Sequence, residues 1–320
     1  MKKSLDKIEE KVLGGEYICF DEAMELTEIE GIEDLFAAAN RIRERFKGKK
    51  TDLCTIMNAK SGRCSENCKY CAQSGHYNTG ITDYPLVSIE DVLKLAKENE
   101  ACGVKRFSLV TSGRTVSEEE LEKLIEIFKV LKQETSLSLC ASLGCISYRH
   151  ALKLKEAGVE MYHHNVETSS DYFDKICDTH SYQDRVDTIK NVISAGLKVC
   201  SGGIIGMGES LQQRIRMAFE VRELGVKSIP INILFPLKGT PMENVQKLAP
   251  EDVLKTFAIF RFIIPDATIR YAGGRASLGN FQRVGLKAGI DGVMLGNYLT
   301  TTGNEIYKDL KMIEELDLEI

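Results

Sequence analysis

The stretch SGRCSENCKYCAQSG, residues 61–75, places Cys64, Cys68 and Cys71 within eight residues. Thiolates this close together can ligate one metal centre, and three thiolates around a cubane 4Fe–4S cluster leave one iron open to chelate a substrate. Structural zinc normally takes four protein ligands, and the nearest candidate for a fourth is His76. The spacing therefore favours an iron–sulfur site, and a zinc-stabilised structural or binding protein is the non-enzymatic alternative.

The sequence around this stretch alternates apolar, β-rich runs with amphipathic segments. Candidate strands lie at residues 52–58, 105–110, 137–143, 159–164, 197–204, 228–234, 267–272 and 291–295. Candidate helices lie at residues 88–100, 117–133, 147–157, 182–195, 210–224, 251–262, 276–287 and 303–315. Eight strand-then-helix units specify a parallel sheet, and eight strands close a barrel. The pattern predicts an α/β protein with a (β/α)8 TIM-type barrel; a doubly wound open sheet is the alternative.

The residues before the first candidate strand have a different, purely helical spacing of apolar side chains, as in Leu5, Ile8 and Val12. We therefore divide the chain into an N-terminal helical cap, residues 1–48, and a barrel with a C-terminal helix, residues 49–320. The cysteine stretch follows the first strand. In such barrels the reactive groups lie at the C-terminal ends of the strands and in the loops that follow them.

Composition limits the class of protein. A chain of 320 residues with 43% hydrophobic and 28% charged residues is ordinary for a globular protein with one large core. A net charge of −5 argues against a general nucleic-acid binder. The N-terminal sequence lacks the apolar region of a signal peptide, and no apolar run approaches the ~20 residues of a membrane span. Ten cysteines in such a chain indicate reduced thiols and metal ligands, and we predict a cytoplasmic protein without a membrane partner.

A second set of side chains falls at one depth inside the predicted barrel. Each stands about three residues into its strand: Cys54, Ser108, Cys140, Cys200 and Arg270. Side chains at equal depth and parity stack in one layer of a barrel. Cysteine often fills space as a small hydrophobic residue, but a buried arginine needs anionic neighbours, which thiolates and sulfides supply. We therefore predict a second, buried iron–sulfur cluster.

The spacing Cys-x-x-x-Cys-x-x-Cys, with the aromatic Tyr70 before the last cysteine, resembles that of the radical S-adenosylmethionine enzymes. Further segments resemble the biotin synthase family within that superfamily: YHHNVETS (162–169), SYQDRVDT (181–188), KVCSGGIIGMGE (198–209), IPINILFPLKGTP (229–241) and IRYAGGR (269–275). With the cysteine stretch, they cover nearly all of residues 50–300 in the order of that family.

The resemblance implies a sulfurtransferase that converts dethiobiotin to biotin. In that family a 4Fe–4S cluster, here at Cys64, Cys68 and Cys71, passes one electron to S-adenosylmethionine, which splits into methionine and a 5′-deoxyadenosyl radical. The radical removes hydrogen from dethiobiotin, and the carbon radical takes sulfur from an auxiliary cluster. A flavodoxin or ferredoxin reductant and a homodimer are also implied.

Residue roles follow from the matched segments. The resemblance places Tyr70 near the adenine, Arg185 on the methionine carboxylate and Asn232 on the ureido group of the substrate. Asn165 and Glu167 match the positions at which the family uses Asn and Asp to contact the ribose and the ureido ring of the substrate. Glu167 is one methylene longer than Asp, so the resemblance does not fix which atoms it contacts. The glycine-rich strand end, which allows close approach to the nucleoside, holds Gly203, Gly206 and Gly208. Without the resemblance, Arg185 reads as a solvated helix charge, and both asparagines read as partners of loop backbone.

The auxiliary site departs from the family. The best-known form of the family holds a 2Fe–2S cluster with three Cys and one Arg. Cys140, Cys200 and Arg270 match three of these four ligand positions. Ser108 stands at the position of the remaining cysteine, and Cys54 stands where that form typically has a serine. Our hypothesis is a 4Fe–5S cluster on Cys54, Cys140 and Cys200, whose extra sulfide is the donated sulfur. The competitor is a 2Fe–2S cluster with Ser108 as an oxygen ligand.

Other cysteines and other functions complete the predictions. Cys145 is a backup ligand for the auxiliary site, and Cys102 and Cys177 are interpreted as incidental. A related radical S-adenosylmethionine enzyme, such as a hydrogenase maturase or an amino-acid mutase, is the enzymatic alternative. The cysteine layer with Asn232 and Arg270 argues against a simple mutase, which has no reason to carry it.

Overall fold

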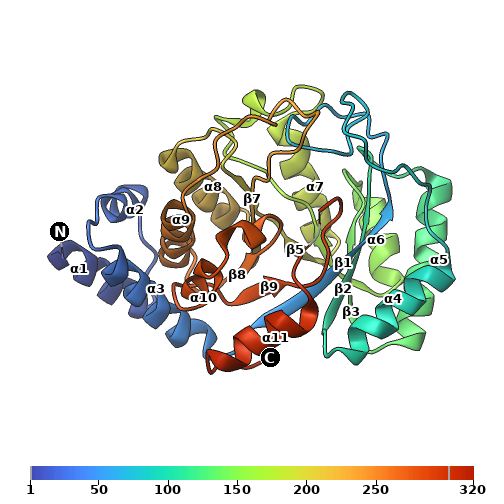
Figure 1. Ribbon diagram of the computed structural model, residues 1–320. Helices are drawn as coiled ribbons and strands as arrows, with labels where there is room; N and C mark the ends of the chain where they lie inside the picture. The colour runs from blue at the N-terminus through green and yellow to red at the C-terminus, as the bar shows by residue number, and fades with distance from the viewer. Residues whose placement is uncertain (1, 302) are drawn as a thin grey trace.

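The computed structural model describes residues 2–301 and 303–320, and its centre is a parallel barrel (Figure 1). The strands are β1 (Asp52–Lys60), β2 (Arg106–Thr111), β3 (Ser138–Ser142), β4 (Val159–His163), β5 (Lys198–Cys200), β6 (Gly203–Ile205), β7 (Ser228–Ile233), β8 (Thr268–Tyr271) and β9 (Gly292–Met294). They pair in the order β5-β4-β3-β2-β1-β9-β8-β7-β6, and a further pairing of β5 with β7 closes the ring. The predicted (β/α)8 barrel is confirmed, and the open-sheet alternative is wrong.

The fifth strand position is split into β5 and β6, because Ser201 and Gly202 interrupt the ladder. A Cβ atom on Gly202 would lie 2.0 Å from the carbonyl oxygen of Pro230, and one on Gly203 would lie 2.4 Å from that of Glu167. Only glycine fits where backbones approach this closely. The interruption therefore brings the segment after β4 against the barrel wall.

Helices surround the barrel at nearly the predicted positions: α4 (Ile89–Ala101), α5 (Glu118–Glu134), α6 (Tyr148–Glu156), α7 (Tyr182–Ser194), α8 (Leu211–Glu223), α9 (Pro250–Ile263) and α11 (Ile306–Glu315). The helix expected at 276–287 forms as a 3-10 turn, η2 (Arg275–Leu278), and a short helix, α10 (Phe281–Leu286). A second 3-10 turn, η1 (Phe173–Lys175), precedes α7. Side-chain N-caps begin five of the helices: Ser88, Ser117, Ser147, Ser181 and Ser210. Each such cap typically stabilises a helix by ~1 kcal/mol.

Three helices precede the barrel, α1 (Lys2–Leu13), α2 (Phe20–Thr27) and α3 (Ile32–Lys47), and Figure 1 shows them at one side, beside α9. Contacts join α3 to α9 and α2 to α8. Buried side chains of α1, among them Leu5, Ile8 and Val12, belong to the same apolar core as the barrel helices. Within the described residues, no helix is both long and apolar enough to cross a membrane.

A buried ion pair fastens α11 to the barrel. Arg275 and Asp309 are both almost fully buried and form two hydrogen bonds, one of them 3.0 Å between Nη1 and Oδ1. Gln282 also accepts a hydrogen bond from Arg275.

Replacing Asp309 with alanine leaves the Arg275 charge buried without its carboxylate. We expect Asp309→Ala to lower the free energy of unfolding by about 3–5 kcal/mol, measured by urea unfolding. Lys308 pairs with Glu305 on the surface, so Lys308→Ala is the control and should change it by less than about 1 kcal/mol. Equal losses in the two variants would contradict this role of the pair.

Candidate active site

A cavity of about 390 Å³ opens among the strand ends and the loops that follow them. Volumes of this size are typical of small-molecule sites. Its wall holds most of the residues predicted from sequence: Cys54, Cys64, Cys68, Tyr70, Cys71, Cys140, Asn165, Glu167, Arg185, Cys200, Asn232 and Arg270. Gly203, Gly206 and Gly208 lie outside this wall, so their approach to a nucleoside stays a prediction. Two sets of three thiols, remote in sequence, thus share one cavity.

The cysteine loop, residues 61–75, is closed on itself by backbone hydrogen bonds. The amide of Cys64 donates to the carbonyl of Gln73 at 3.0 Å, and the amide of Gly75 donates back to the carbonyl of Cys64 at 2.8 Å. Between them, the amide of Cys71 donates to the carbonyl of Cys68 at 3.0 Å and forms a turn. This closed loop carries all three sulfurs to the cavity wall. Three free thiols on one wall fit the donor set of a cluster with an open iron.

The inner cysteines, Cys54, Cys140 and Cys200, lie deeper in the barrel, beside Arg270. Nη1 of Arg270 donates to Sγ of Cys54 at 3.0 Å, and its Nη2 donates to Oδ1 of Asp52 at 2.6 Å. Sequence reasoning missed Asp52, which Arg106 also contacts at 3.0 Å. The alternation of side chains along β1 was an available signal, because Asp52 and Cys54 lie two residues apart and face the same side.

Burial and the neighbouring guanidinium groups act in opposite directions on the pKa of the inner thiols. Burial raises the pKa of Cys54, Cys140 and Cys200. The guanidinium of Arg270 opposes this rise in pKa for Cys54 and Cys200, as does that of Arg106 for Cys140. A bound iron centre would supply the positive charge that thiolates need.

Several buried polar atoms beside the inner cysteines have no hydrogen-bond partner in the described part of the chain. They are Nε of Arg106, Nε of Arg270 and Oγ of Ser108. Buried donors without acceptors are costly, and a group with negative sulfur atoms would satisfy them. This donor set fits an auxiliary iron–sulfur cluster. It leaves Ser108 able to act as a hydrogen-bond donor or as a ligand.

The opposite part of the wall joins Arg185, Asn165 and Glu167. Arg185 is buried, so the interpretation as a solvated helix charge is wrong. Its Nη1 donates to the carbonyl of Asn165 at 3.0 Å and to Oε1 of Glu167 at 3.3 Å. No described residue accepts a hydrogen bond from Nη2 of Arg185, which leaves that nitrogen for a ligand carboxylate. Glu167 has a positive φ of 71°, which is a strained backbone conformation for a residue other than glycine. Such strained conformations cluster at ligand sites.

The two predicted amide side chains form hydrogen bonds with the backbone. Oδ1 of Asn165 accepts from the amide of Gly202 at 3.1 Å, and Oδ1 of Asn232 accepts from the amide of Gly273 at 2.8 Å. Nδ2 of Asn232 also donates to the carbonyl of Gly203 at 3.2 Å. These contacts fit the structural interpretation of both residues, and their contacts with substrate stay predictions.

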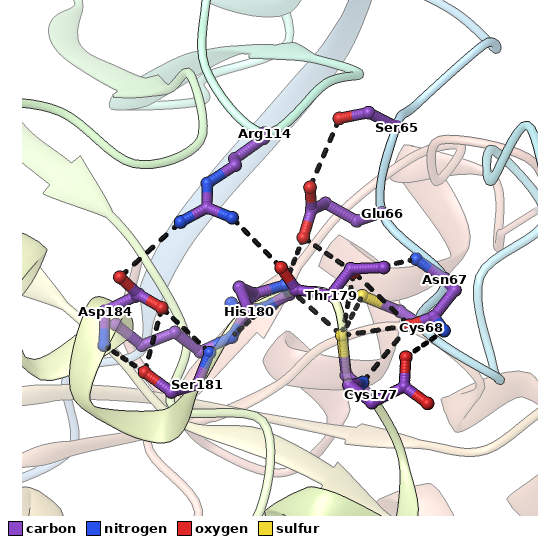
Figure 2. A network of polar contacts seen from close by, with 12 residues as sticks. Ser65, Glu66, Asn67, Cys68, Arg114, Cys177, Thr179, His180, Ser181 and Asp184 are labelled. Carbon is purple, nitrogen blue, oxygen red and sulfur yellow. Dashed lines mark hydrogen bonds and ion pairs between the residues drawn. The ribbon is translucent and has the colours of Figure 1, made fainter.

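One network next to the cysteine loop was missed from sequence (Figure 2). Sγ of Cys177 lies 3.7 Å from Sγ of Cys68, and Nδ1 of His180 lies 3.2 Å from Sγ of Cys177. Glu66 accepts a hydrogen bond from the same Nδ1 at 2.5 Å. Cys177, interpreted from the sequence as incidental, thus contacts a predicted cluster ligand. Its spacing of three residues from His180, just before a helix, was the available signal.

Comparison with known proteins shows the family. The Radical SAM superfamily profile matches residues 59–221, and that of the Biotin and Thiamin Synthesis associated domain matches residues 230–319. The biotin synthase of Acetivibrio thermocellus is 59% identical, over 99% of this chain and 99% of that protein. The biotin synthase of Clostridium tetani is 53% identical, over 100% of this chain and 99% of its own. The chain belongs to the biotin synthase family. It is therefore an enzyme, and biotin synthase membership implies a 4Fe–4S cluster and S-adenosylmethionine as cofactors.

Solved structures show the same barrel at low identity. Methylornithine synthase (PylB) superposes with a TM-score of 0.85 at 19% identity, covering 98% of this chain and 96% of that one. The hydrogenase maturase HydG from Carboxydothermus hydrogenoformans superposes with a TM-score of 0.83 at 16% identity, covering 99% and 79%. These likenesses show the fold alone. Membership of the biotin synthase family removes the zinc-stabilised structural protein as an alternative.

Two histidines on the cavity wall make the fold sensitive to acid. Burial lowers the pKa of His163 to about 4 and that of His164 well below its usual value. The unfolded chain therefore binds more protons than the folded chain below about pH 6.5, and stability falls as the pH drops from there towards 4. For His163 alone we expect a loss of about 2 kcal/mol at pH 5, read from urea unfolding of the metal-free chain. His163→Asn should lose less between pH 7 and 5, whereas the variant of the exposed His76, His76→Asn, should match the wild type. A loss unchanged in His163→Asn would contradict the assignment.

Proposed function

We propose that this enzyme inserts sulfur into dethiobiotin to form biotin, with S-adenosylmethionine cleaved at a 4Fe–4S cluster and sulfur donated by an auxiliary iron–sulfur cluster. The observation that carries the proposal is the single cavity whose wall holds both sets of three thiols. A substrate in such a cavity can meet both clusters without leaving the barrel, and a closed site keeps a radical away from solvent.

The cysteine loop would hold the first cluster through Cys64, Cys68 and Cys71. When bound, that cluster supplies one electron to S-adenosylmethionine and so provides the hydrogen-abstracting radical. Arg185 would bind the methionine carboxylate through its open Nη2, and Glu167 holds the same guanidinium in place from the other side. Tyr70, half-buried on the wall, would pack near the adenine. Asn165 and Asn232 would orient ribose and ureido groups once ligand competes for their amides.

The auxiliary cluster would be held by Cys54, Cys140 and Cys200, with Arg270 as the charged neighbour. Three thiolates around a four-iron centre leave one iron for the extra sulfide of a 4Fe–5S cluster. Support comes from the hydrogen bond that Arg270 donates to Sγ of Cys54. Cys54 therefore lies beside the same buried arginine, on the cavity wall that also holds Cys140 and Cys200. A 2Fe–2S cluster with Ser108 as ligand is the competing form, and iron prefers thiolate to an alkoxide.

A related radical enzyme, such as a maturase or mutase, is the alternative, and the inner cysteines argue against a simple mutase, whose reaction does not require them. We also propose a flavodoxin or ferredoxin reductant, a homodimer and a cytoplasmic location, all from the family resemblance. The division into a helical cap at 1–48 and a barrel at 49–320 is likewise proposed. Because side chains of the cap belong to the same apolar core as the barrel helices, truncation of residues 1–48 would test whether the barrel folds without the cap.

The experiment is anaerobic reconstitution with iron and sulfide, followed by dethiobiotin, S-adenosylmethionine and a chemical reductant, with products read by mass spectrometry. We expect biotin, and about eight irons per chain for two four-iron clusters. Biotin with about six irons would keep the function and favour the two-iron auxiliary cluster. Finding 5′-deoxyadenosine without biotin would overturn the proposed substrate.

A further inference from the structure

Cys177 is a buried thiol placed directly behind Cys68 of the cysteine loop. It follows η1, and among the described residues it is the one thiol with which Cys68 forms a hydrogen bond, at 3.7 Å between the two sulfurs. Cys68 also lines the cavity, whereas Cys177 does not. A small reagent that enters the cavity therefore meets Cys68 first and finds Cys177 behind it.

Backbone contacts hold the two segments side by side. The amide of Lys69 donates to the carbonyl of Ile176 at 2.9 Å, and the amide of Asn67 donates to Oγ1 of Thr179 at 3.1 Å. Asn67 and Asp178 are also joined by a side-chain hydrogen bond. Each of the two cysteines is thus flanked by residues that bind the other segment, and Figure 2 shows Cys68 and Cys177 side by side with Asn67 and Thr179. These contacts between the two segments therefore hold the cysteines next to each other.

The hydrogen bonds of His180 argue against a metal site in this place. A ring nitrogen of His180 and the sulfurs of Cys68 and Cys177 lie within 4.8 Å of one another, a spacing that could hold an ion. Nε2 of His180, however, accepts a hydrogen bond from Nε of Arg185 at 3.1 Å, so the ring proton of the neutral imidazole lies on Nδ1. That proton is donated to Glu66 at 2.5 Å. A protonated nitrogen has no lone pair for a metal, although Nδ1 of His180 lies 3.2 Å from Sγ of Cys177.

We propose that Cys68 and Cys177 form a disulfide when the cluster is absent and hydrogen peroxide reaches the cavity. A disulfide needs ~2.05 Å between the sulfurs, which lie 3.7 Å apart, so the two atoms must approach by about 1.7 Å. The disulfide depends only on the geometry of the pair. Its protective value rests on the proposed function, because it requires that Cys68 be a cluster ligand.

The reaction balances with peroxide as the two-electron oxidant. Cys68 gives up its proton and its sulfur attacks one peroxide oxygen, the O–O bond breaks, and Cys68 becomes a sulfenic acid while hydroxide leaves. The Cys177 thiolate then attacks the sulfur of that sulfenic acid, the S–S bond forms and a second hydroxide leaves. Two thiols and one peroxide therefore give one disulfide and two waters. Without a resolving thiol the sulfenic acid is oxidised further to sulfinic acid, which thiol reductants do not reverse.

The test uses the full-length, metal-free protein with one equivalent of hydrogen peroxide, followed by alkylation, tryptic digestion and tandem mass spectrometry. Cleavage after lysine and arginine leaves Cys64 and Cys68 together in residues 64–69 and Cys177 in residues 176–185. We expect these two peptides to be linked, with fragment ions that assign the link to Cys68. A link from Cys68 to Cys64 or Cys71, or a Cys177 that remains fully alkylated, overturns the proposal.

A second measurement separates the resolving role from a structural one. After excess peroxide and then a thiol reductant, we expect about fivefold more sulfinic acid at Cys68 in Cys177→Ala than in the wild type, with a matching deficit in iron taken up on reconstitution. Cys102→Ala, which removes an exposed cysteine, is the matched control and should behave as the wild type. Equal sulfinic acid in wild type and Cys177→Ala overturns the protective role. The linked peptide is measured without biotin formation, so failure of the proposed function leaves this result readable.

Discussion

Replacing Cys54 with alanine is expected to stop biotin formation while 5′-deoxyadenosine is still released. Cys54 is bound to Arg270 at 3.0 Å in the inner set, and the three cysteines of the loop are untouched by this change. We expect biotin to fall by more than about 100-fold, since loss of a ligand exceeds the usual cost of losing an outer contact of a metal site. Iron should fall from about eight to about four per chain, because only the loop cluster remains.

Ser108→Ala is the matched control, because Ser108 lines the same cavity and its hydroxyl has no partner in the described chain. It should keep both biotin formation and the full iron content. The reverse pattern, with Ser108→Ala inactive and Cys54→Ala carrying a normal auxiliary cluster, would replace our ligand set with the two-iron form.

Replacing Arg185 with alanine is expected to weaken binding of S-adenosylmethionine by about 100-fold. The change removes a buried guanidinium with one open nitrogen, and a hydrogen bond between charged groups contributes about 1.5–3 kcal/mol. It also leaves Glu167 without its cation beside the ligand. Binding to the reconstituted protein, measured by equilibrium dialysis under anaerobic conditions, gives the effect directly.

Arg114 is the control for charge alone, because it also lines the cavity but contacts Thr179 and Asp184 near the surface. Arg114→Ala should change the affinity by less than about threefold, as expected for an exposed pair. If the two variants weakened binding equally, general electrostatic attraction would explain both results. That outcome would contradict a specific contact between Arg185 and the methionine carboxylate.

The barrel was predictable because its signals are local. Apolar runs alternate with amphipathic segments, and serine caps mark where the helices begin, as at Ser88 and Ser117. The inner set was predictable from the depth of Cys54, Cys140 and Cys200 along their strands, since a barrel converts depth into a shared layer. The split of the fifth strand at Ser201 and Gly202 was not, because it depends on how closely Pro230 approaches from the next strand.

The missed residues depend on contacts between distant segments. We expected thiolates and sulfides to balance the charge of Arg270, but Asp52 also does so, from the strand that carries Cys54. The pairing of Cys68 with Cys177 joins loops 109 residues apart, and no periodicity reports the packing of two irregular segments. Sequence patterns thus predict which residues face the barrel interior better than which of them touch.

The first strand of the barrel, β1, pairs with its last, β9, and this has a consequence for how the protein is made. β1 ends at Lys60 and β9 begins at Gly292, so roughly 230 residues must leave the ribosome before the ring can form. At ~5–20 residues per second, translation of that interval takes about 10–50 s. Through that time the edge of β1 and the thiol of Cys54 lack their final neighbours. Neither the cavity nor its inner metal centre can be completed until the last strand has been made.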